Sequence, residues 1–270
     1  MALKNDHKEG RYLYCIVNCS EETDFGQMGI EDNLVYTVVF NDIGAVVHCC
    51  EAKPYKTEDK EKAAEWVLAH QYVIDLATKE FGTVIPLTFD TIFLGEDETV
   101  KNWLSDEYRQ LKALLVELEE KAEYGIQVFL ENDFVDKMIE ESEEIQRLRG
   151  ELENKSTGVA YLFEKRLEER IRLEKEASTN KCAKELYDQI TNLVDNVKLE
   201  STSREVPEKW KSKQMILNLA CLAHKDKIQS LGNMLAEVNK KEGFAVRFTG
   251  PWPPYSFVGE IGEPKTEVNR

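Results

Sequence analysis

The chain has 270 residues, of which 42% are hydrophobic and 32% are charged, and its formal net charge is −16. This length suits one large domain or two ordinary ones, while the negative charge disfavours nucleic acid and anionic membrane surfaces as partners. No stretch approaches the roughly 20 apolar residues of a membrane helix, and the charged start does not resemble a signal peptide. We therefore expect a cytoplasmic protein that binds neither nucleic acid nor membrane.

The first 82 residues predict strands followed by a helix. The segment "RYLYCIVNC" (11–19) is typical of a buried strand, and two strands between residues 33 and 50 are separated by the turn residues Asn41, Asp42 and Gly44, which indicates a hairpin. A helix is expected from Glu58 to Phe81, with Gly82 as its stop. Its predicted apolar face consists of Trp66, Ala69, Val73, Leu76 and Ala77.

The next segment, "TVIPLTFDTIF" (83–93), is apolar but contains Pro86, which favours an edge strand or a strand leading into a loop. Helical periodicity then runs from Asp97 to Glu123. Asp97 and Glu98 are explained by their place at the start of this helix, where acidic side chains complement the helix dipole.

The second half begins with a predicted strand, "GIQVFLE" (125–131), followed by a charged helical stretch from about Asp133 to Leu199 with a possible break near Gly150. If residues 157–199 formed one helix, it would be roughly 60 Å long. Apolar residues at steps of four, three and four form a narrow seam suited to coiled-coil-like pairing, namely Leu186, Ile190, Leu193 and Val197.

The remaining elements complete a second domain. "QMILNLACLAH" (214–224) predicts a strand, an amphipathic helix follows, and "FAVRFTG" (244–250) predicts the last strand. The order from Gly125 is interpreted as strand, long helix, strand, strand, helix, strand, which is the order of a ferredoxin-like unit. The predicted fold class is α+β with two domains, the second a modified ferredoxin-like βαββαβ unit with a long, partly coiled-coil-like first helix. The predicted bounds are 1–123, 124–260 and a flexible tail at 261–270.

The sequence contains no established catalytic or cofactor motif, with no GxGxxG, Walker-type loop, HExxH or GxSxG. The six cysteines lack zinc-ligand spacing and are expected to be small buried apolar residues. The histidines are expected to be exposed or hydrogen-bonded structural residues, and the acidic runs to be solvated faces. We therefore expect no catalytic residue, no metal site, no cofactor and no enzymatic activity.

The stretch "FTGPWPPYSFVGE" (248–260) holds three prolines and four aromatic residues, a content that excludes a helix or a central strand. Three readings are open. The stretch is a stiff loop covering a domain edge, a PxxP ligand through Pro251 and Pro254, or a rigid loop that presents an aromatic binding anchor. The local sequence favours the structural loop.

Several segments together resemble the gas vesicle protein F/L family. The ending "TGPWPPYSFV" is similar to the signature ending of that family, and "YLYCIV", "VIPLTFDTIF", "GIQVFLE", "GVAYLFEKR" (158–166) and "MILNLACLAHKDKIQSL" resemble its other segments in the same order. The resemblance covers nearly the whole chain. One departure is that Thr88 and Asp90 stand where the family usually has arginine and glycine.

The resemblance implies an accessory or minor structural protein of gas vesicles that is not an enzyme. Members are expected to act in early assembly, to bind the small hydrophobic gas vesicle shell protein, to limit its aggregation, and to associate with other gas vesicle accessory proteins. It also implies two α+β domains, the second a modified ferredoxin fold, and a location at the gas vesicle.

We hypothesise that the shell protein contacts two family-typical segments, because core packing alone explains them least. The candidate interaction residues are Ile85, Pro86, Leu87, Phe89, Trp252, Tyr255 and Phe257. The alternative function is a ferredoxin-like small-molecule-binding regulatory module. The sequence lacks the set of polar residues expected of such a binding site, and a resemblance in fold alone is weak evidence of function. An enzyme of unknown type is the third hypothesis.

Overall fold

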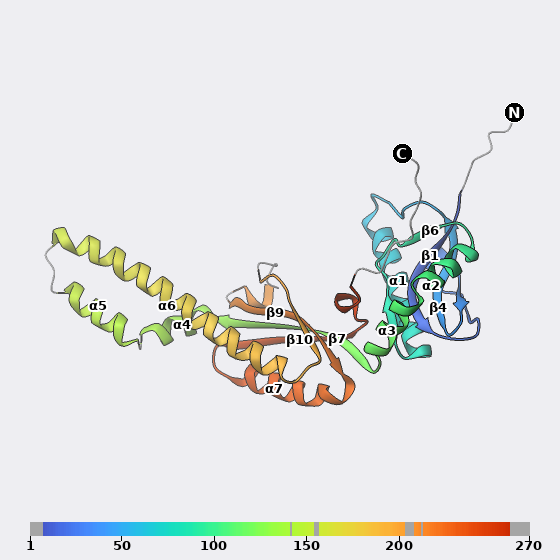
Figure 1. The fold of residues 1–270 in the computed structure, drawn as a ribbon. Helices are drawn as coiled ribbons and strands as arrows, with labels where there is room; N and C mark the ends of the chain where they lie inside the picture. The colour runs from blue at the N-terminus through green and yellow to red at the C-terminus, as the bar shows by residue number, and fades with distance from the viewer. Residues whose placement is uncertain (1–7, 141, 154–156, 203–207, 212, 260–270) are drawn as a thin grey trace. The chain divides into compact units, whose positions relative to one another are not determined.

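The computed structural model describes residues 8–140, 142–153, 157–202, 208–211 and 213–259. The chain divides into two compact units, the first made of Met1–Glu123 and Pro251–Arg270 and the second of Tyr124–Gly250 (Figure 1). The sequence assigned residues 251–260 to the second domain, whereas the contacts place the chain from Pro251 onward with the first unit, because Tyr255 packs against the core of that unit. The predicted tail at 261–270 lies outside the described residues.

The first unit is built on a sheet in the order β2-β3-β4-β1-β5, with β6 also paired to β1. The central strand β1 runs antiparallel to β4, β5 and β6. Residues 10–17 of β1 are all buried, because neighbours cover both its edges and both its faces. The strands are β1 (Glu9–Asn18), β2 (Asp24–Gln27), β3 (Leu34–Phe40), β4 (Ile43–Glu51), β5 (Val84–Pro86) and β6 (Ile92–Leu94).

The predicted hairpin is confirmed as β3 and β4, with Phe40 paired to Ile43 across a two-residue turn. Asn41 adopts a positive φ of 55°, which asparagine tolerates better than most residues. The predicted edge segment 83–93 forms β5 and β6, which pair with residues 15–17 and 10–12 of β1 on either side of a turn.

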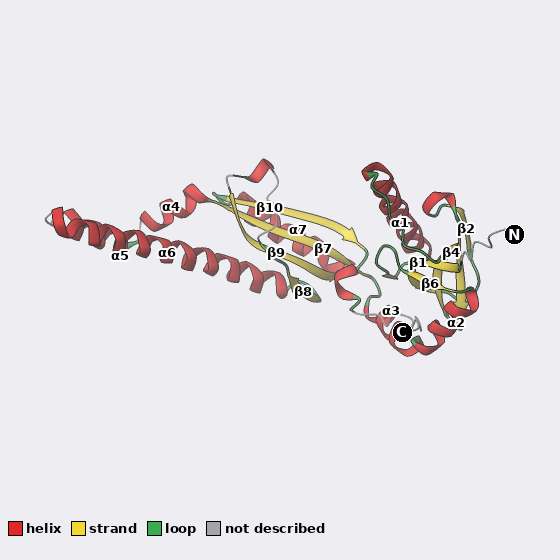
Figure 2. Ribbon diagram, turned by 90° about the horizontal axis from the view of Figure 1, so that it is seen from above, coloured by secondary structure: helices red, strands yellow, loops and turns green. Residues whose placement is uncertain are grey.

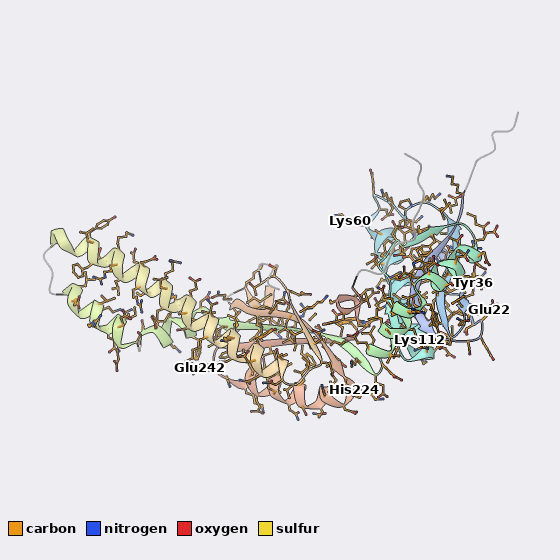
Figure 3. The ribbon with its side chains drawn as sticks, in the orientation of Figure 1. Glu22, Tyr36, Lys60, Lys112, His224 and Glu242 are labelled. Carbon is orange, nitrogen blue, oxygen red and sulfur yellow. The ribbon has the colours of Figure 1, made fainter. Side chains whose placement is uncertain are left out.

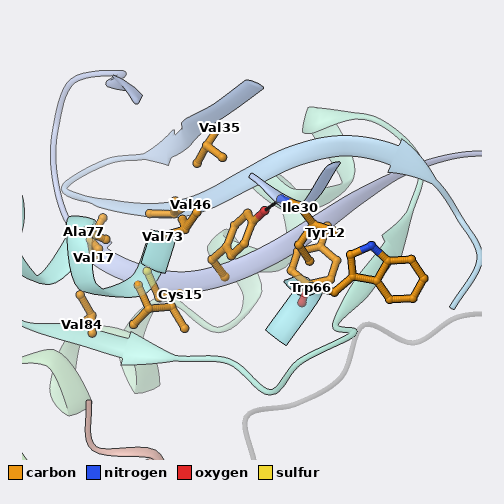
Figure 4. Close-up of a cluster of buried hydrophobic side chains, with 12 residues drawn as sticks. Tyr12, Cys15, Val17, Ile30, Val35, Val46, Trp66, Val73, Ala77 and Val84 are labelled. Atoms are coloured by element: carbon orange, nitrogen blue, oxygen red, sulfur yellow. Dashed lines mark hydrogen bonds between the residues drawn. The ribbon is translucent and has the colours of Figure 1, made fainter. Parts of the chain in front are cut away.

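Helix α1 (Lys60–Phe81) begins where the Asp59 carboxylate accepts hydrogen bonds from the backbone N–H groups of Glu61 and Lys62. It ends at Gly82, whose positive φ of 80° suits a helix stop. The buried face points into the apolar cluster of Figure 4 and consists of Trp66, His70, Val73, Ile74 and Ala77. Of the predicted face, Ala69 and Leu76 are only partly buried.

Helices α2 (Asp97–Asp106) and α3 (Tyr108–Glu117) follow β6. Arg11 contacts Asp97 of α2, while its neighbour Tyr12 contacts His70 of α1. Because successive strand residues face opposite sides of a sheet, α1 and α2 cover opposite faces. The predicted single helix over 97–123 is wrong at its end. Helix α3 stops at Glu117, Glu120 turns the chain with φ 56°, and Lys121 begins a strand, because pairing in the second sheet extends that strand backwards.

The second unit contains a four-stranded sheet in the order β10-β7-β9-β8. Its strands are β7 (Lys121–Glu131), β8 (Asn196–Leu199), β9 (Lys213–His224) and β10 (Phe244–Trp252), and helix α7 (Ile228–Lys240) joins β9 to β10. Gly243, with φ 80°, enters β10 at a place where a Cβ atom would lie 2.4 Å from the Phe134 ring. The strand predictions for 125–131 and 214–224 and the helix after them are confirmed.

A helical arm extends from this sheet (Figures 1 and 2). It comprises α4 (Asn132–Glu140), α5 (Glu143–Glu153) and α6 (Thr157–Thr191), with α4 and α5 packed along α6. Arg170 of α6 forms an ion pair with Glu144 of α5, and Lys175 pairs with Asp136 of α4. Helix α5 continues through Gly150 to Glu153, so the predicted break lies a few residues later than expected.

The predicted seam over residues 186–197 is wrong. Helix α6 ends at Thr191, and Val197 lies in β8. Leu186 and Ile190 are 5% and 0% exposed, and α6 packs against β9. A helix face that rests on a sheet has the same apolar spacing as one that rests on a helix, so the spacing alone did not distinguish the two.

Candidate functional site

The C-terminal aromatic loop (residues 251–259) begins as the end of edge strand β10, which accommodates Pro251 because an edge strand has one unpaired side. Pro253 and Pro254 are buried, and a single 3-10 turn follows from Tyr255 to Phe257, which the proline content did not predict. Trp252 is 50% exposed. The loop thus holds one large aromatic side chain in solvent beside two buried prolines.

Hydrogen bonds fasten this loop to the first unit. Ser256 donates from its backbone N–H and from its hydroxyl to the two carboxylate oxygens of Glu123, at 2.8 and 2.6 Å. The Tyr255 hydroxyl donates to the Gln71 side-chain oxygen of α1 at 3.3 Å. Because the first and second residues of the 3-10 turn are bound, the segment that follows Trp252 is preorganised, which lowers the entropy cost of any contact that Trp252 makes.

The other predicted interaction residues lie mostly inside the first unit. Ile85, Pro86 and Leu87 are buried, and Phe89 is partly buried against the core cluster that also receives Tyr255. These side chains pack the protein and do not form a surface. Phe257 is partly buried as well. Of the seven candidates, Trp252 is the one whose side chain is half exposed.

A buried network of tyrosines and histidines lies beneath the "VIPLTFD" segment. The Tyr12 hydroxyl bonds to His70 Nδ1 at 2.9 Å, and the Tyr14 hydroxyl bonds to His48 Nδ1 at 2.7 Å. Each tyrosine ring stacks on the histidine to which its own hydroxyl is not bonded. Tyr12 stacks on His48 and Tyr14 on His70, with ring centroids 4.9 and 5.5 Å apart. Sequence reasoning expected structural histidines and did not find this network.

Backbone donors also reach the two tyrosines. The N–H of Asp90 donates to the Tyr12 hydroxyl at 3.0 Å. The N–H of Ile30 donates to the Tyr14 hydroxyl at 3.0 Å, a bond drawn as a dashed line in Figure 4. The Leu87 carbonyl oxygen near His70 Nε2 can only accept, so Nδ1 of the neutral His70 ring accepts the hydrogen bond of the Tyr12 hydroxyl.

The second nitrogen of each imidazole is bonded as well. His70 Nε2 donates to the Leu87 carbonyl at 3.2 Å, and His48 Nε2 is hydrogen-bonded to the Tyr55 hydroxyl at 3.0 Å. Burial lowers the pKa of both histidines to about 4. With both nitrogens of each ring bonded to protein groups, the network holds the core together and suits no proton transfer to a ligand.

Asp90 shows how this chain fills the position where the related family usually has glycine. Its φ is 71°, in the left-handed region that favours glycine and that aspartate tolerates better than most residues. Its carboxylate accepts a hydrogen bond from the Tyr55 backbone N–H at 2.9 Å. The aspartate side chain thereby ties the segment before α1 to the turn between β5 and β6.

A polar cluster also lies on the α2 side of the sheet. Arg11, 5% exposed, contacts Asp97 at 2.6 Å, and the Tyr36 hydroxyl, labelled in Figure 3, donates to the same carboxylate oxygen at 2.7 Å. Burial alone would raise the pKa of Asp97, but these two hydrogen bonds outweigh it and hold the pKa below its ordinary value. Asp97 therefore has a second structural role besides its place at the start of α2.

Chemistry elsewhere is sparse in the described ranges. Over those ranges, no group of three or more His, Cys, Asp or Glu side chains is arranged to hold a metal ion. All six cysteines lie outside disulfide bonds. Cys15 and Cys221 are buried, and Cys19, Cys50 and Cys182 are partly buried, whereas Cys49 is exposed, so the expectation of buried cysteines is wrong for Cys49 and holds only in part for three others. Every described helix is too short or too polar to span a bilayer.

Comparison with known proteins identifies the relatives of this chain. The family described as Gas vesicle synthesis protein GvpL/GvpF matches residues 10–259. Gas vesicle protein L1 of Halobacterium salinarum is 34% identical, over 94% of this chain and 92% of its own length. Gas vesicle protein L of Haloferax mediterranei is 30% identical, over 94% and 89% of the two chains.

Among solved structures, the crystal structure of the gas vesicle protein GvpF from Anabaena sp. superposes with a TM-score of 0.74 at 18% identity, covering 94% of this chain and 99% of that one. At this identity the likeness concerns the fold, a mixture of helices and sheets. The comparisons do not favour a small-molecule-binding regulatory module.

Proposed function

Because the chain belongs to the gas vesicle GvpL/GvpF family, we propose that it is an accessory or minor structural protein that binds the small hydrophobic shell protein during vesicle assembly and limits its aggregation. The proposal includes association with other gas vesicle accessory proteins and assigns the chain no enzymatic step. Its place of action is the cytoplasm and the growing vesicle.

The observation that carries this proposal is the presentation of Trp252. A shell subunit with an apolar gas-facing side exposes aggregation-prone surface before it assembles. A half-exposed tryptophan on a loop fixed by Glu123 and Gln71 offers such a surface a rigid anchor. The net charge of −16 keeps the resulting complex dispersed by repulsion.

The proposed contact is narrower than the sequence hypothesis. The "VIPLTF" segment contributes core residues, so its part is to hold the first unit together. Of the residues in the sequence hypothesis, we keep Trp252 as the anchor because it is half exposed. We exclude Tyr255 from the binding test because it packs against the core, and a truncation there would confuse loss of binding with loss of structure.

Co-purification with the shell protein tests the proposal. Trp252→Ala should reduce the recovered shell protein and increase its aggregation, since exposed aromatic anchors often dominate binding. Tyr161→Ala is the matched control, because Tyr161 is an aromatic side chain, 62% exposed, on the arm of the second unit. Equal recovery with Trp252→Ala and wild type, at unchanged melting temperature, would remove the loop from the proposal.

We further propose that the second unit is a modified ferredoxin-like domain. Its elements follow the order strand, helices, strand, strand, helix, strand, and β7 and β9 occupy the centre of the sheet between β10 and β8. Cross-strand contacts measured by NMR check this arrangement, and contacts between β7 and β8 as direct neighbours would contradict it.

A further inference from the structure

Helix α1 carries apolar side chains on the side that faces away from the core. Val67, Leu68 and Tyr72 are 50%, 68% and 50% exposed, and we call these three residues the outer stripe. Leu68 and Tyr72 are four residues apart and lie on the side of the helix away from the buried residues Trp66 and Val73, while Val67 lies on the flank of that side. None of these three apolar residues belongs to the buried face that the sequence predicts for this helix.

The outer stripe adjoins the aromatic loop. The Tyr255 hydroxyl donates to the Gln71 side-chain oxygen at 3.3 Å, and the Gln71 amide donates in turn to Asp75 at 2.9 Å. Gln71 precedes Tyr72 and lies one helical turn after Val67. The 3-10 turn that follows Trp252 is therefore attached to α1 beside the outer stripe.

The charges around the outer stripe are predominantly negative. Glu61, Glu65 and Asp75 are exposed on the same side of α1 as Leu68. Lys62, the cation in this stretch, is paired with Glu31 at 3.1 Å and lies 5.1 Å from the centre of the Trp66 ring. The carboxylates thus flank the apolar stripe without a neighbouring free ammonium group between Glu61 and Asp75.

We propose that the outer stripe docks an amphipathic helix of a partner protein whose apolar face is flanked by Lys or Arg. Leu68 and Tyr72, one helical turn apart, form a ridge against which a second helix can pack, Val67 adds apolar area on its flank, and the carboxylates supply the complementary charge. A second copy of this chain would place Glu65 and its neighbours against like charges, and an anionic lipid surface would be repelled. The inference rests on the proposed function, because it names the kind of segment by which the shell protein is captured.

Designed peptides test the docking face directly. The probe is a fluorescently labelled 18-residue Leu/Lys amphipathic helix, and its twin carries Glu in place of every Lys. We expect the full-length protein to bind the Leu/Lys peptide and not the Leu/Glu twin. The double variant Leu68→Ser, Tyr72→Ser should bind the Leu/Lys peptide at least about tenfold more weakly, since central apolar anchors usually cost that much or more when removed.

The control variant is Val116→Ser, because Val116 is an exposed apolar residue on α3 of the same unit and is 61% exposed. Its affinity for the Leu/Lys peptide should equal that of wild type, and all variants should keep the wild-type melting temperature because the changed side chains lie outside the core. Equal affinity of wild type and the double variant, or equal binding of both peptides, overturns the inference.

Co-purification of the shell protein with the same variants separates this inference from the proposed function. Loss of the shell protein from the double variant, but not from Val116→Ser, supports both. Full recovery with the double variant overturns the docking face while the proposed function stands. If wild type itself recovers no shell protein, the proposed function fails, and the peptide measurement alone decides whether the outer stripe binds a basic helix.

Discussion

Lowering the pH from about 7.5 to about 5 should weaken the first unit through His48 and His70. Both are neutral in the core, and burial is the cause of their low pKa of about 4. In the unfolded chain the ordinary pKa of histidine is about 6.5, so the unfolded state binds more protons between these two values. The stabilisation is therefore complete above about pH 6.5 and is lost as the pH falls toward 4.

The magnitude follows from the two pKa values. At about pH 5 an unfolded histidine is almost fully protonated and a folded one almost neutral, so each contributes a loss of ~2 kcal/mol to the free energy of unfolding, or ~4 kcal/mol for the pair. This is a large part of the ~5–15 kcal/mol of a typical domain. Asp42 and Asp97, whose pKa values are lowered, lose their contributions only below about pH 4, outside this window.

Urea unfolding followed by tryptophan fluorescence measures this effect. In a Trp210→Phe, Trp252→Phe background the remaining tryptophans, Trp66 and Trp103, both lie in the first unit and report on it. His70→Gln should remove about half of the pH dependence between pH 7.5 and 5. His224→Gln, in the second unit, is the control and should leave the dependence of the first unit unchanged.

An NMR titration of the imidazole signals provides a second reading that does not require a stable variant. His48 and His70 should stay neutral down to about pH 5 in the folded protein. An ordinary histidine titration near pH 6.5, or a pH dependence that is undiminished in both His70→Gln and His48→Gln, would refute the argument.

Three further changes test the packing and the polar contacts. Leu186→Ala should cost ~2–4 kcal/mol of unfolding free energy in chemical denaturation, whereas Leu173→Ala, at a 43% exposed position of the same helix, should cost under ~0.5 kcal/mol; equal costs would contradict the assigned face. Asp90→Gly should be nearly neutral, because relief of the left-handed backbone offsets the lost bond to Tyr55, while Asp90→Ala should cost ~1–2 kcal/mol; the reverse order of melting temperatures would be inconsistent with φ 71°. Asp97→Asn should cost ~2–3 kcal/mol because it leaves Arg11 buried with a weaker partner, and a cost near zero would show that Glu9 compensates fully.

Elements with a strong local pattern were predictable. Strand β1 is a continuous apolar run, and α1 has Asp59 before it and Gly82 after it, so its bounds follow from capping chemistry as well as from periodicity. The end of α3 and strand β8 were not predictable in the same way. Residues 121–123 and 196–199 are compatible with a helix locally, and their pairing in the second sheet decides their structure.

The candidate site was likewise predictable from the sequence only in part. Its family-typical segments are visible in the sequence, and the proline content of residues 251–254 predicts a stiff segment. The Tyr–His network was not predictable, because it joins residues from β1, β4, α1 and two loops through hydrogen bonds that only the assembled core creates. Two tyrosines placed two residues apart on one strand were the available signal.

The sequence by itself determined the family, the principal elements and the absence of recognised catalytic motifs. The tertiary structure decided which apolar residues are inside and which are outside. Ile85 and Leu87 went into the core, while Trp252, Leu68 and Tyr72 stayed in solvent. The physical reason is that the burial of a side chain depends on whether a segment distant in sequence packs over it. A local pattern of apolar residues does not contain that information.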